Sequence, residues 1–148
     1  MAIRIQTEAF DPGVETNGFL ESSQGAGAAV TFTGLVRSDP KQPISALTLD
    51  CYPELATTQI DAMEAEAVAR FGLLRATVIH RYGTLAPGEP IVQVMTLAPH
   101  RRAAFEAAEF LMDYLKTDAP FWKKESGSGG EHWVEHNSAD DRAKARWS

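Results

Sequence analysis

The stretch HRRAAFEAAEFLMDYLKTDAPFWKKE, residues 100–125, contains a long helical pattern and five lysine and arginine residues. Pro99 suits the first turn of this helix, and the residues before Pro120 should end it near Lys116. Apolar side chains recur every three or four residues, as in an amphipathic helix with one face in the core: Phe105, Ala108, Met112 and Leu115, with Ala104 and Leu111 beside them. The stretch therefore predicts a core helix with basic residues near both ends.

The start of this helix carries His100, Arg101 and Arg102. Backbone amides at a helix start lack partners and carry a partial positive charge, so each cation there costs up to about 1 kcal/mol. A bound anion would balance these charges, because a helix start is a prepared anion site. A solvated basic turn explains the same spacing, and the two interpretations stay open.

His100 and Lys116 are too far apart to meet one small substrate within one copy of the chain. They are sixteen residues apart, and a helix rises ~1.5 Å per residue, which separates them by ~24 Å. If both ends of the helix are functional, either the protein has two sites or two copies build one site between them.

The composition predicts an ordinary globular chain. A sequence of 148 residues with 44% hydrophobic content is expected to form a single domain, residues 1–148, whose core needs no disulfides. The net charge of −6 and the pI of about 5.2 argue against general binding to nucleic acids or anionic membranes. The sequence shows no charged-then-apolar leader and no apolar run of 18 residues, so neither secretion nor a membrane span is expected.

The single cysteine, Cys51, excludes an internal disulfide and a cysteine metal cluster. A reducing compartment such as the cytoplasm fits this usage best. Because Cys51 falls in a strand pattern, a half-buried structural residue is favoured over a catalytic thiol.

Strand and helix patterns are mixed irregularly along the chain, which predicts an α+β sandwich of mostly antiparallel strands with packed helices, not a doubly wound sheet. The segment 28–36 should be a buried strand, and 75–82 should pair antiparallel with 91–97. Strands are expected at residues 2–9, 28–36, 44–52, 75–82, 91–97 and 132–135, and helices at 12–22, 54–71 and from Ser138 onward.

Three connecting segments are expected to lie outside these strands and helices. Residues 83–90 should form a turn, since they contain a Pro-Gly pair. The aromatic pair Phe121-Trp122 should anchor the chain after the long helix, and residues 126–130 should form a flexible glycine-serine loop.

The sequence contains no GxSxG, P-loop, HExxH, GxGxxG or paired-cysteine motif. Hydrolase, NTPase, metalloprotease and dinucleotide-binding functions therefore lose their usual support. His132 and His136 are four residues apart but lie in a strand-like stretch, and His80 should be a hydrogen-bonded strand residue. We expect no metal site and no cofactor.

Basic residues at the ends of elements are the remaining candidates for chemistry: Arg37, Arg101, Lys116, Lys123 and Lys124. Such positions commonly contact ligands, and their natural ligand is an anionic, phosphorylated small molecule. A lysine crowded by other cations has reason for a lowered pKa and could transfer protons or form a covalent adduct. A scatter of solvated basic residues remains the alternative.

At these same residues the chain resembles the catalytic (large) subunits of molybdopterin synthase. The resemblance spans nearly the whole chain and implies a hammerhead-like α+β fold. It also implies an enzyme, a sulfurtransferase that converts cyclic pyranopterin monophosphate to molybdopterin with sulfur from the thiocarboxylated Gly-Gly tail of a small ubiquitin-like subunit. The donor sulfur would then arrive on the partner, and Cys51 would need no chemical role. The matching stretches are residues 27–37, 78–83, 100–116 and 119–125.

The resemblance also implies roles for particular residues. Lys116 and Lys123 match the two lysines on which catalysis depends. Leu35 stands where relatives often carry a basic residue, and Lys124 replaces a frequent arginine, which keeps the charge but loses the forked geometry. Substrate contacts are expected at Leu35, Val36, Arg37, His100, Arg101, Lys116, Lys123, Lys124 and Glu125.

The resemblance implies a homodimer of catalytic subunits with a small subunit at each end, a heterotetramer. A non-catalytic module that binds an anionic ligand or a ubiquitin-like tail is the alternative. Such a module would keep Arg37 and Arg101 but would not need two lysines flanking an aromatic pair.

Overall fold

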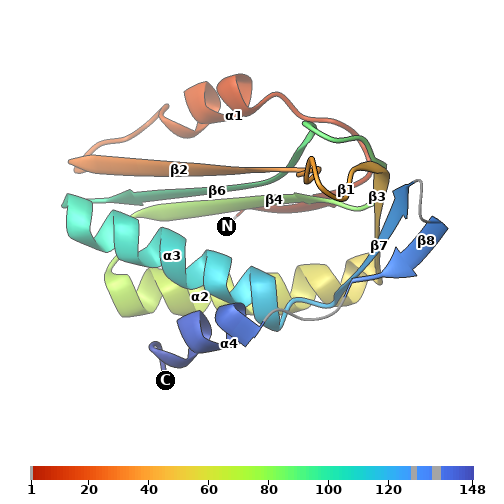
Figure 1. Cartoon of the computed structure of the whole chain (residues 1–148). Coiled ribbons are helices and arrows are strands. Elements are labelled where there is room, and N and C mark those ends of the chain that lie inside the picture. Colours follow the sequence, from red (N-terminus) through yellow and green to blue (C-terminus); the bar gives the residue numbers. More distant parts are fainter. Residues whose placement is uncertain (1, 128–129, 135–137) are drawn as a thin grey trace.

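The computed structural model describes residues 2–127, 130–134 and 138–148, which form two four-stranded sheets and their covering helices (Figure 1). One sheet has the strand order β1-β4-β6-β2 and the other the order β5-β3-β7-β8. The α+β fold expected from the sequence is confirmed. The elements are β1 (Ala2–Gln6), α1 (Pro12–Phe19), β2 (Ala28–Leu35), β3 (Ile44–Cys51), α2 (Pro53–Phe71), β4 (Arg75–Arg81), β5 (Gly83–Leu85), β6 (Pro90–Ala98), α3 (Arg101–Thr117), β7 (Phe121–Gly127), β8 (Gly130–Trp133) and α4 (Ser138–Ala145).

The central strands β4 and β6 are buried on both faces because helices cover both sides of the first sheet (Figure 1). Val78 and Val94 point into the core shared with α2 and α3, whereas Ile79 and Met95 point to a smaller core closed by Phe19 of α1. This two-sided burial explains why both strands read as nearly continuous apolar runs. They pair antiparallel, as predicted.

The second sheet contains two strands that the sequence patterns did not predict. The segment expected to be only a turn contains β5, and the segment after the long helix forms β7 instead of an anchor followed by a loop. Both strands pair with β3. Their partners are distant in sequence, so pairing and not a local apolar alternation makes them strands.

Helix α3 starts after the N-cap His100 and ends at Thr117, close to the predicted bounds. Pro99 lies just before the N-cap and not in the first turn. The prediction that Phe105 faces the core is wrong, because its side chain is 60% exposed while Phe110 and Tyr114 are buried. The helix packs against both α2 and the sheet, and this shifts its buried face away from Phe105.

Strand β2 is half exposed, contrary to the prediction that it is buried. It lies at the edge of the first sheet, and its Phe32 side chain is 40% exposed. An edge strand has a neighbour on one side only, so its side chains keep more contact with solvent.

The side chain of Glu64 on α2 is fully buried, and neither of its carboxyl oxygens has a hydrogen-bond partner among the described residues. Burial, with a smaller contribution from the charge of Asp61, raises the pKa of Glu64 from 4.5 to about 8. Between about pH 4.5 and pH 8 the unfolded chain releases this proton while the folded chain keeps it. Stability from this group is therefore lost as the pH rises through that range.

We expect Glu64→Gln to stabilise the protein at pH 8, because glutamine mimics the neutral acid. The melting temperature should rise by roughly 2–6 °C, corresponding to about 1–2 kcal/mol, and the gain should vanish below pH 5. Thermal unfolding measured from pH 5 to pH 8 checks this, with Glu66→Gln at an exposed site of the same helix as the control. If the melting temperatures of the two variants changed equally with pH, the raised pKa assigned to Glu64 would be contradicted.

Candidate active site

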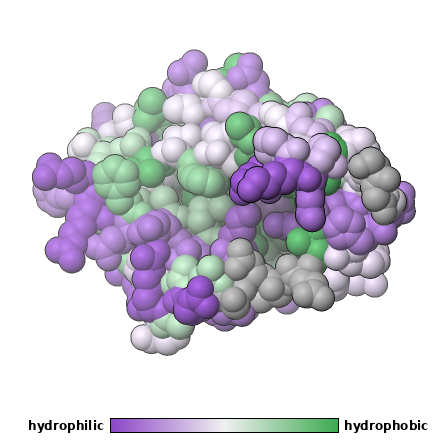
Figure 2. All heavy atoms as spheres, in the orientation of Figure 1, coloured by the Kyte–Doolittle hydropathy of each residue, from purple (hydrophilic) through white to green (hydrophobic). Residues whose placement is uncertain are grey.

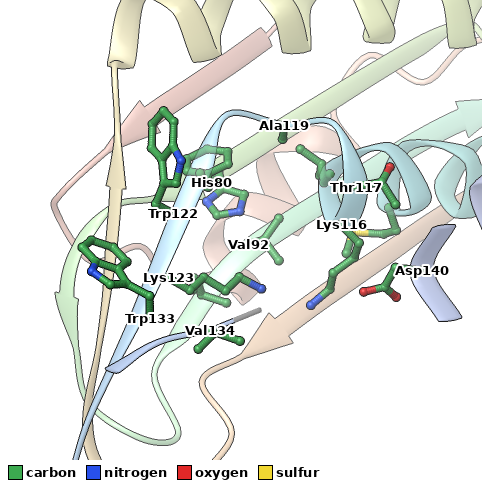
Figure 3. A pocket seen from close by; sticks show the side chains of 14 residues that line it. His80, Val92, Lys116, Thr117, Ala119, Trp122, Lys123, Trp133, Val134 and Asp140 are labelled. Atoms are coloured by element: carbon green, nitrogen blue, oxygen red, sulfur yellow. The ribbon is translucent and has the colours of Figure 1, made fainter. Parts of the chain in front are cut away.

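A cavity of about 520 Å³ opens where the end of α3 meets β7 (Figure 3). Its polar lining comes from four elements: His80 of β4, Lys116 of α3, Lys123 of β7 and Asp140 of α4. Apolar side chains of β6, α3 and β7 complete the walls. The cavity therefore gathers residues from distant parts of the chain around two lysines.

Lys116 and Lys123 approach the same space from two sides (Figure 3). Lys116 is exposed in the last turn of α3, and Lys123 is partly buried on β7. Side chains alternate along a strand, so Lys123 and Phe121 share one face of β7, and both line the cavity. The structure thus brings together the two lysines predicted to be catalytic.

Burial, and next the charge of Lys116 and the contact with it, lower the pKa of Lys123 from 10.5 to about 8. At neutral pH about a tenth of Lys123 is then an uncharged amine, far more than for a solvated lysine. An uncharged amine accepts protons and acts as a nucleophile. Lys123 therefore has the chemistry that the sequence suggested for a lysine crowded by cations.

His80 is a site residue that the sequence analysis did not assign. Its buried ring stacks on Phe121 with centroids 4.0 Å apart, and Nδ1 donates to the Arg81 carbonyl oxygen at 2.8 Å. Burial lowers the pKa of His80 to about 4, and the charges of Lys123 and Lys116 add to the effect. The ring is therefore neutral at physiological pH and leaves Nε2 as an acceptor. The hydrogen bond expected from its strand position is present, but no sequence spacing places it beside the lysines.

The other predicted contacts lie at both ends of α3. Strand β2 runs antiparallel to β6, so Ala28 pairs with Ala98 near His100, while Leu35 pairs with Pro90 near the cavity. The exposed residues Leu35 and Arg37 are therefore at the cavity end, and His100 and Arg101 are at the far end of the helix. The structure does not bring His100 and Arg101 to the lysines of the same copy.

Comparison with known proteins identifies the family. The sequence model of the MoaE protein family matches residues 5–118. The chain belongs to the MoaE family. It is 50% identical over 147 residues to the molybdopterin synthase catalytic subunit of Cereibacter sphaeroides, covering 99% of this chain and 100% of that protein.

Two solved structures of MoaE relatives share the fold. The molybdopterin biosynthesis MoaE protein from Burkholderia ambifaria MC40-6 matches with a TM-score of 0.84 at 44% identity, covering 99% of this chain and 98% of that one. Molybdopterin synthase from Staphylococcus aureus matches with a TM-score of 0.81 at 27% identity, covering 90% and 96%. The family expected from the sequence is confirmed.

Three other predicted contact residues of this MoaE chain have partners within it. Lys124 points away from the cavity, and its Nζ forms an ion pair with Oε2 of Glu131 at 3.4 Å. Oε1 of Glu125 lies 3.2 Å from Nε2 of His132. The side chain of Val36 is buried, its amide donates to the Glu89 carbonyl, and its carbonyl oxygen accepts from Gly88. Contacts from these residues to a substrate stay predictions.

Exposed aromatic side chains border the cavity. Trp122 and Trp133 line it and also line a second hollow of about 390 Å³, together with Asp50, Cys51 and Tyr52. Trp122 is 48% exposed and meets Tyr52 edge-to-face with ring centroids 5.9 Å apart. Phe121 is the more buried member of the pair. The cavity is thus entered past a rim of aromatic rings.

The described residues contain no group of three or more metal-binding side chains placed to hold a metal ion. His132 faces Glu125, and His136 lies outside the described residues. Within that same part of the chain, no helix combines the length and the apolar character needed to cross a membrane.

We expect Cys51→Ser to keep its activity. Cys51 is a half-buried free thiol at the end of β3 that does not line the lysine cavity. Burial, and next the charge of Asp50, raise the pKa of the thiol, so it stays protonated at neutral pH. Replacing the thiol by a hydroxyl should cost about 1 kcal/mol of stability. Turnover and thermal unfolding check this, and lost turnover in a stably folded variant would contradict it.

Proposed function

We propose that this MoaE protein is the catalytic subunit of molybdopterin synthase. It transfers sulfur from the thiocarboxylated Gly-Gly tail of a small ubiquitin-like subunit to cyclic pyranopterin monophosphate and so forms the dithiolene of molybdopterin. The observation that carries the proposal is the convergence of Lys116 and Lys123 in one cavity. The relative from Cereibacter sphaeroides, 50% identical over its full length, is named for this activity.

The two lysines suit different parts of this chemistry. The exposed Lys116 provides a positive charge for the thiocarboxylate or for the substrate phosphate. In each transfer the thiocarboxylate sulfur forms a carbon–sulfur bond on the pterin side chain while the carbon–oxygen bond at that carbon breaks, and the oxygen leaves with the phosphate or as water. A second water then cleaves the thioester, which leaves the sulfur on the pterin as a thiolate and releases the glycine carboxylate of the carrier. Lys123, with its pKa lowered to about 8, can take the proton from that water. The neutral ring of His80 adds no further positive charge to the cavity.

We further propose that two copies of the chain build each site. Lys116 lies ~24 Å from His100 along α3, so the basic helix start serves the lysines of another copy. Figure 2 shows apolar side chains gathered between β2 and α3, with hydrophilic side chains beyond the end where α3 starts. The exposed Phe32 and Phe105 belong to these two elements. A two-fold axis across this face would bring opposite ends of the two helices together.

The same proposal covers the subunit assembly, the single-domain organisation of the chain and its cellular compartment. Two catalytic subunits and two small subunits form a heterotetramer, and the aromatic rim of Trp122 and Trp133 receives the carrier tail. The whole chain, residues 1–148, acts as one domain. The free thiol of Cys51 suits the reducing cytoplasm.

The activity is tested by incubating the protein with the thiocarboxylated small subunit and cyclic pyranopterin monophosphate. Wild type should form the dithiolene product, and Lys116→Ala and Lys123→Ala should each lose most of it, by roughly 100-fold or more. Both side chains lie outside the hydrophobic core, so folding should be unaffected. A wild type that binds the carrier tail without forming product would indicate a binding module, and wild-type turnover in either variant would remove that lysine from catalysis.

The shared site is tested by mixing two inactive variants, Arg101→Ala and Lys116→Ala. Random subunit exchange makes about half of the dimers heterodimers, each with one intact site, so about a quarter of wild-type activity should return. A mixture of Lys116→Ala with Lys123→Ala is the matched control. Both of its defects lie at the same helix end, so each site of that heterodimer keeps one defect. No recovery in the first mixture, with exchange verified by mass measurement, would place the site within one subunit.

A further inference from the structure

The C-terminal helix α4 is clamped onto α3 by the residues that follow it. The ring of Trp147 meets Phe71 and Phe110 edge-to-face, each with centroids 5.7 Å apart. Its indole Nε1 donates to Asp113 of α3 at 2.6 Å, and Arg146 donates to the same carboxylate at 2.9 Å. The sequence predicted this helix but not its packing partner, which these contacts identify as α3. They hold α4 in a defined place.

The other end of α4 reaches the cavity. Asp140 lies in its first turn, is partly buried and lines the cavity with Lys116 and Lys123. Figure 3 shows the carboxyl group of Asp140 turned toward the end of the Lys116 side chain. Among the described residues that line the cavity, Asp140 is the only one with a carboxylate.

The titratable groups around Lys123 come from four elements. Lys116 of α3 repels its charged form, the neutral His80 of β4 adds no charge, and Glu125 of its own strand and Asp140 of α4 favour it. Glu125 does not line the cavity and is engaged by a histidine. Asp140 is therefore the carboxylate that acts across the cavity, and it raises the pKa of Lys123 against the larger lowering by burial and Lys116.

We propose that Asp140 is a positioning residue of the active site. The clamped helix holds its carboxylate against the lysine pair, where it is a counter-charge beside Lys116 and controls when Lys123 releases its proton. Without this carboxylate, Lys123 would lose its proton at a lower pH, and neither lysine would have a counter-charge among the described residues that line the cavity. The effect of Asp140 on the rate of sulfur transfer rests on the proposed function, whereas its effect on the pKa of Lys123 does not.

The coupling is measured without any assay of activity, by following the lysine ε-carbon signals of isotope-labelled protein through a pH titration. Lys123→Arg identifies the signal of Lys123. In Asp140→Asn the pKa of Lys123 should fall by roughly half a unit or more. Asp140→Glu should keep most of the wild-type value, because the charge remains. The matched control is Asp141→Asn, which removes the same charge from the same helical turn at a position that does not line the cavity.

The acidic limb of the pH profile of kcat/KM for sulfur transfer should move by the same amount and in the same direction in Asp140→Asn. Asp141→Asn and Asp140→Glu should leave it in place. The inference would be overturned if Asp140→Asn left the pKa of Lys123 unchanged, or if Asp141→Asn shifted that pKa by the same amount. Either result would mean that the Asp140 carboxylate acts only on the start of α4 and not across the cavity on Lys123. A wild type without sulfur transfer would overturn the proposed function, and the titration would still decide the role of Asp140.

Discussion

The antiparallel pairing of β7 with β3 is the interaction on which the cavity depends. It matches Phe121 with Cys51 and Lys123 with Leu49, and so directs the chain back across the end of α3. Phe121 can then stack on His80, and Lys123 faces the space next to Lys116. A short loop joins α3 to β7, but the loop alone does not determine which face of β7 turns inward. The register with β3 does, since a slip of one residue would turn the side chain of Lys123 to the opposite face of β7, away from Lys116.

This arrangement places two ammonium groups in a partly buried space, where their repulsion is poorly screened. The rest of the fold must supply the stability that this repulsion removes. Strands β4 and β6 do so, because their side chains fill cores on both faces of the first sheet. Functional sites commonly contain groups with shifted pKa values, and here the well-packed first sheet is the scaffold that supports such a site.

Helix α3 has two tasks that its sequence combines. Its buried face contributes Ala104, Leu111 and Leu115 to the main core, and Thr96 of β6 donates a hydrogen bond to the Ala104 carbonyl that fixes the helix on the sheet. Its length keeps the basic start apart from Lys116. Because the helix is rigid, the separation of its basic ends cannot be closed by local motion, and this constraint supports a site shared between copies.

The sequence by itself determined the features that depend on local pattern. Helical periodicity located α2 and α3, and apolar runs located β4 and β6. Only the tertiary structure decided that Phe105 is exposed, that residues 121–127 form a strand, and that His80 and Asp140 join the lysines. Periodicity specifies which side of an element is apolar, but not which element will lie against it. The cavity is made by segments up to 60 residues apart, from His80 to Asp140, whose meeting is a property of sheet pairing and helix packing.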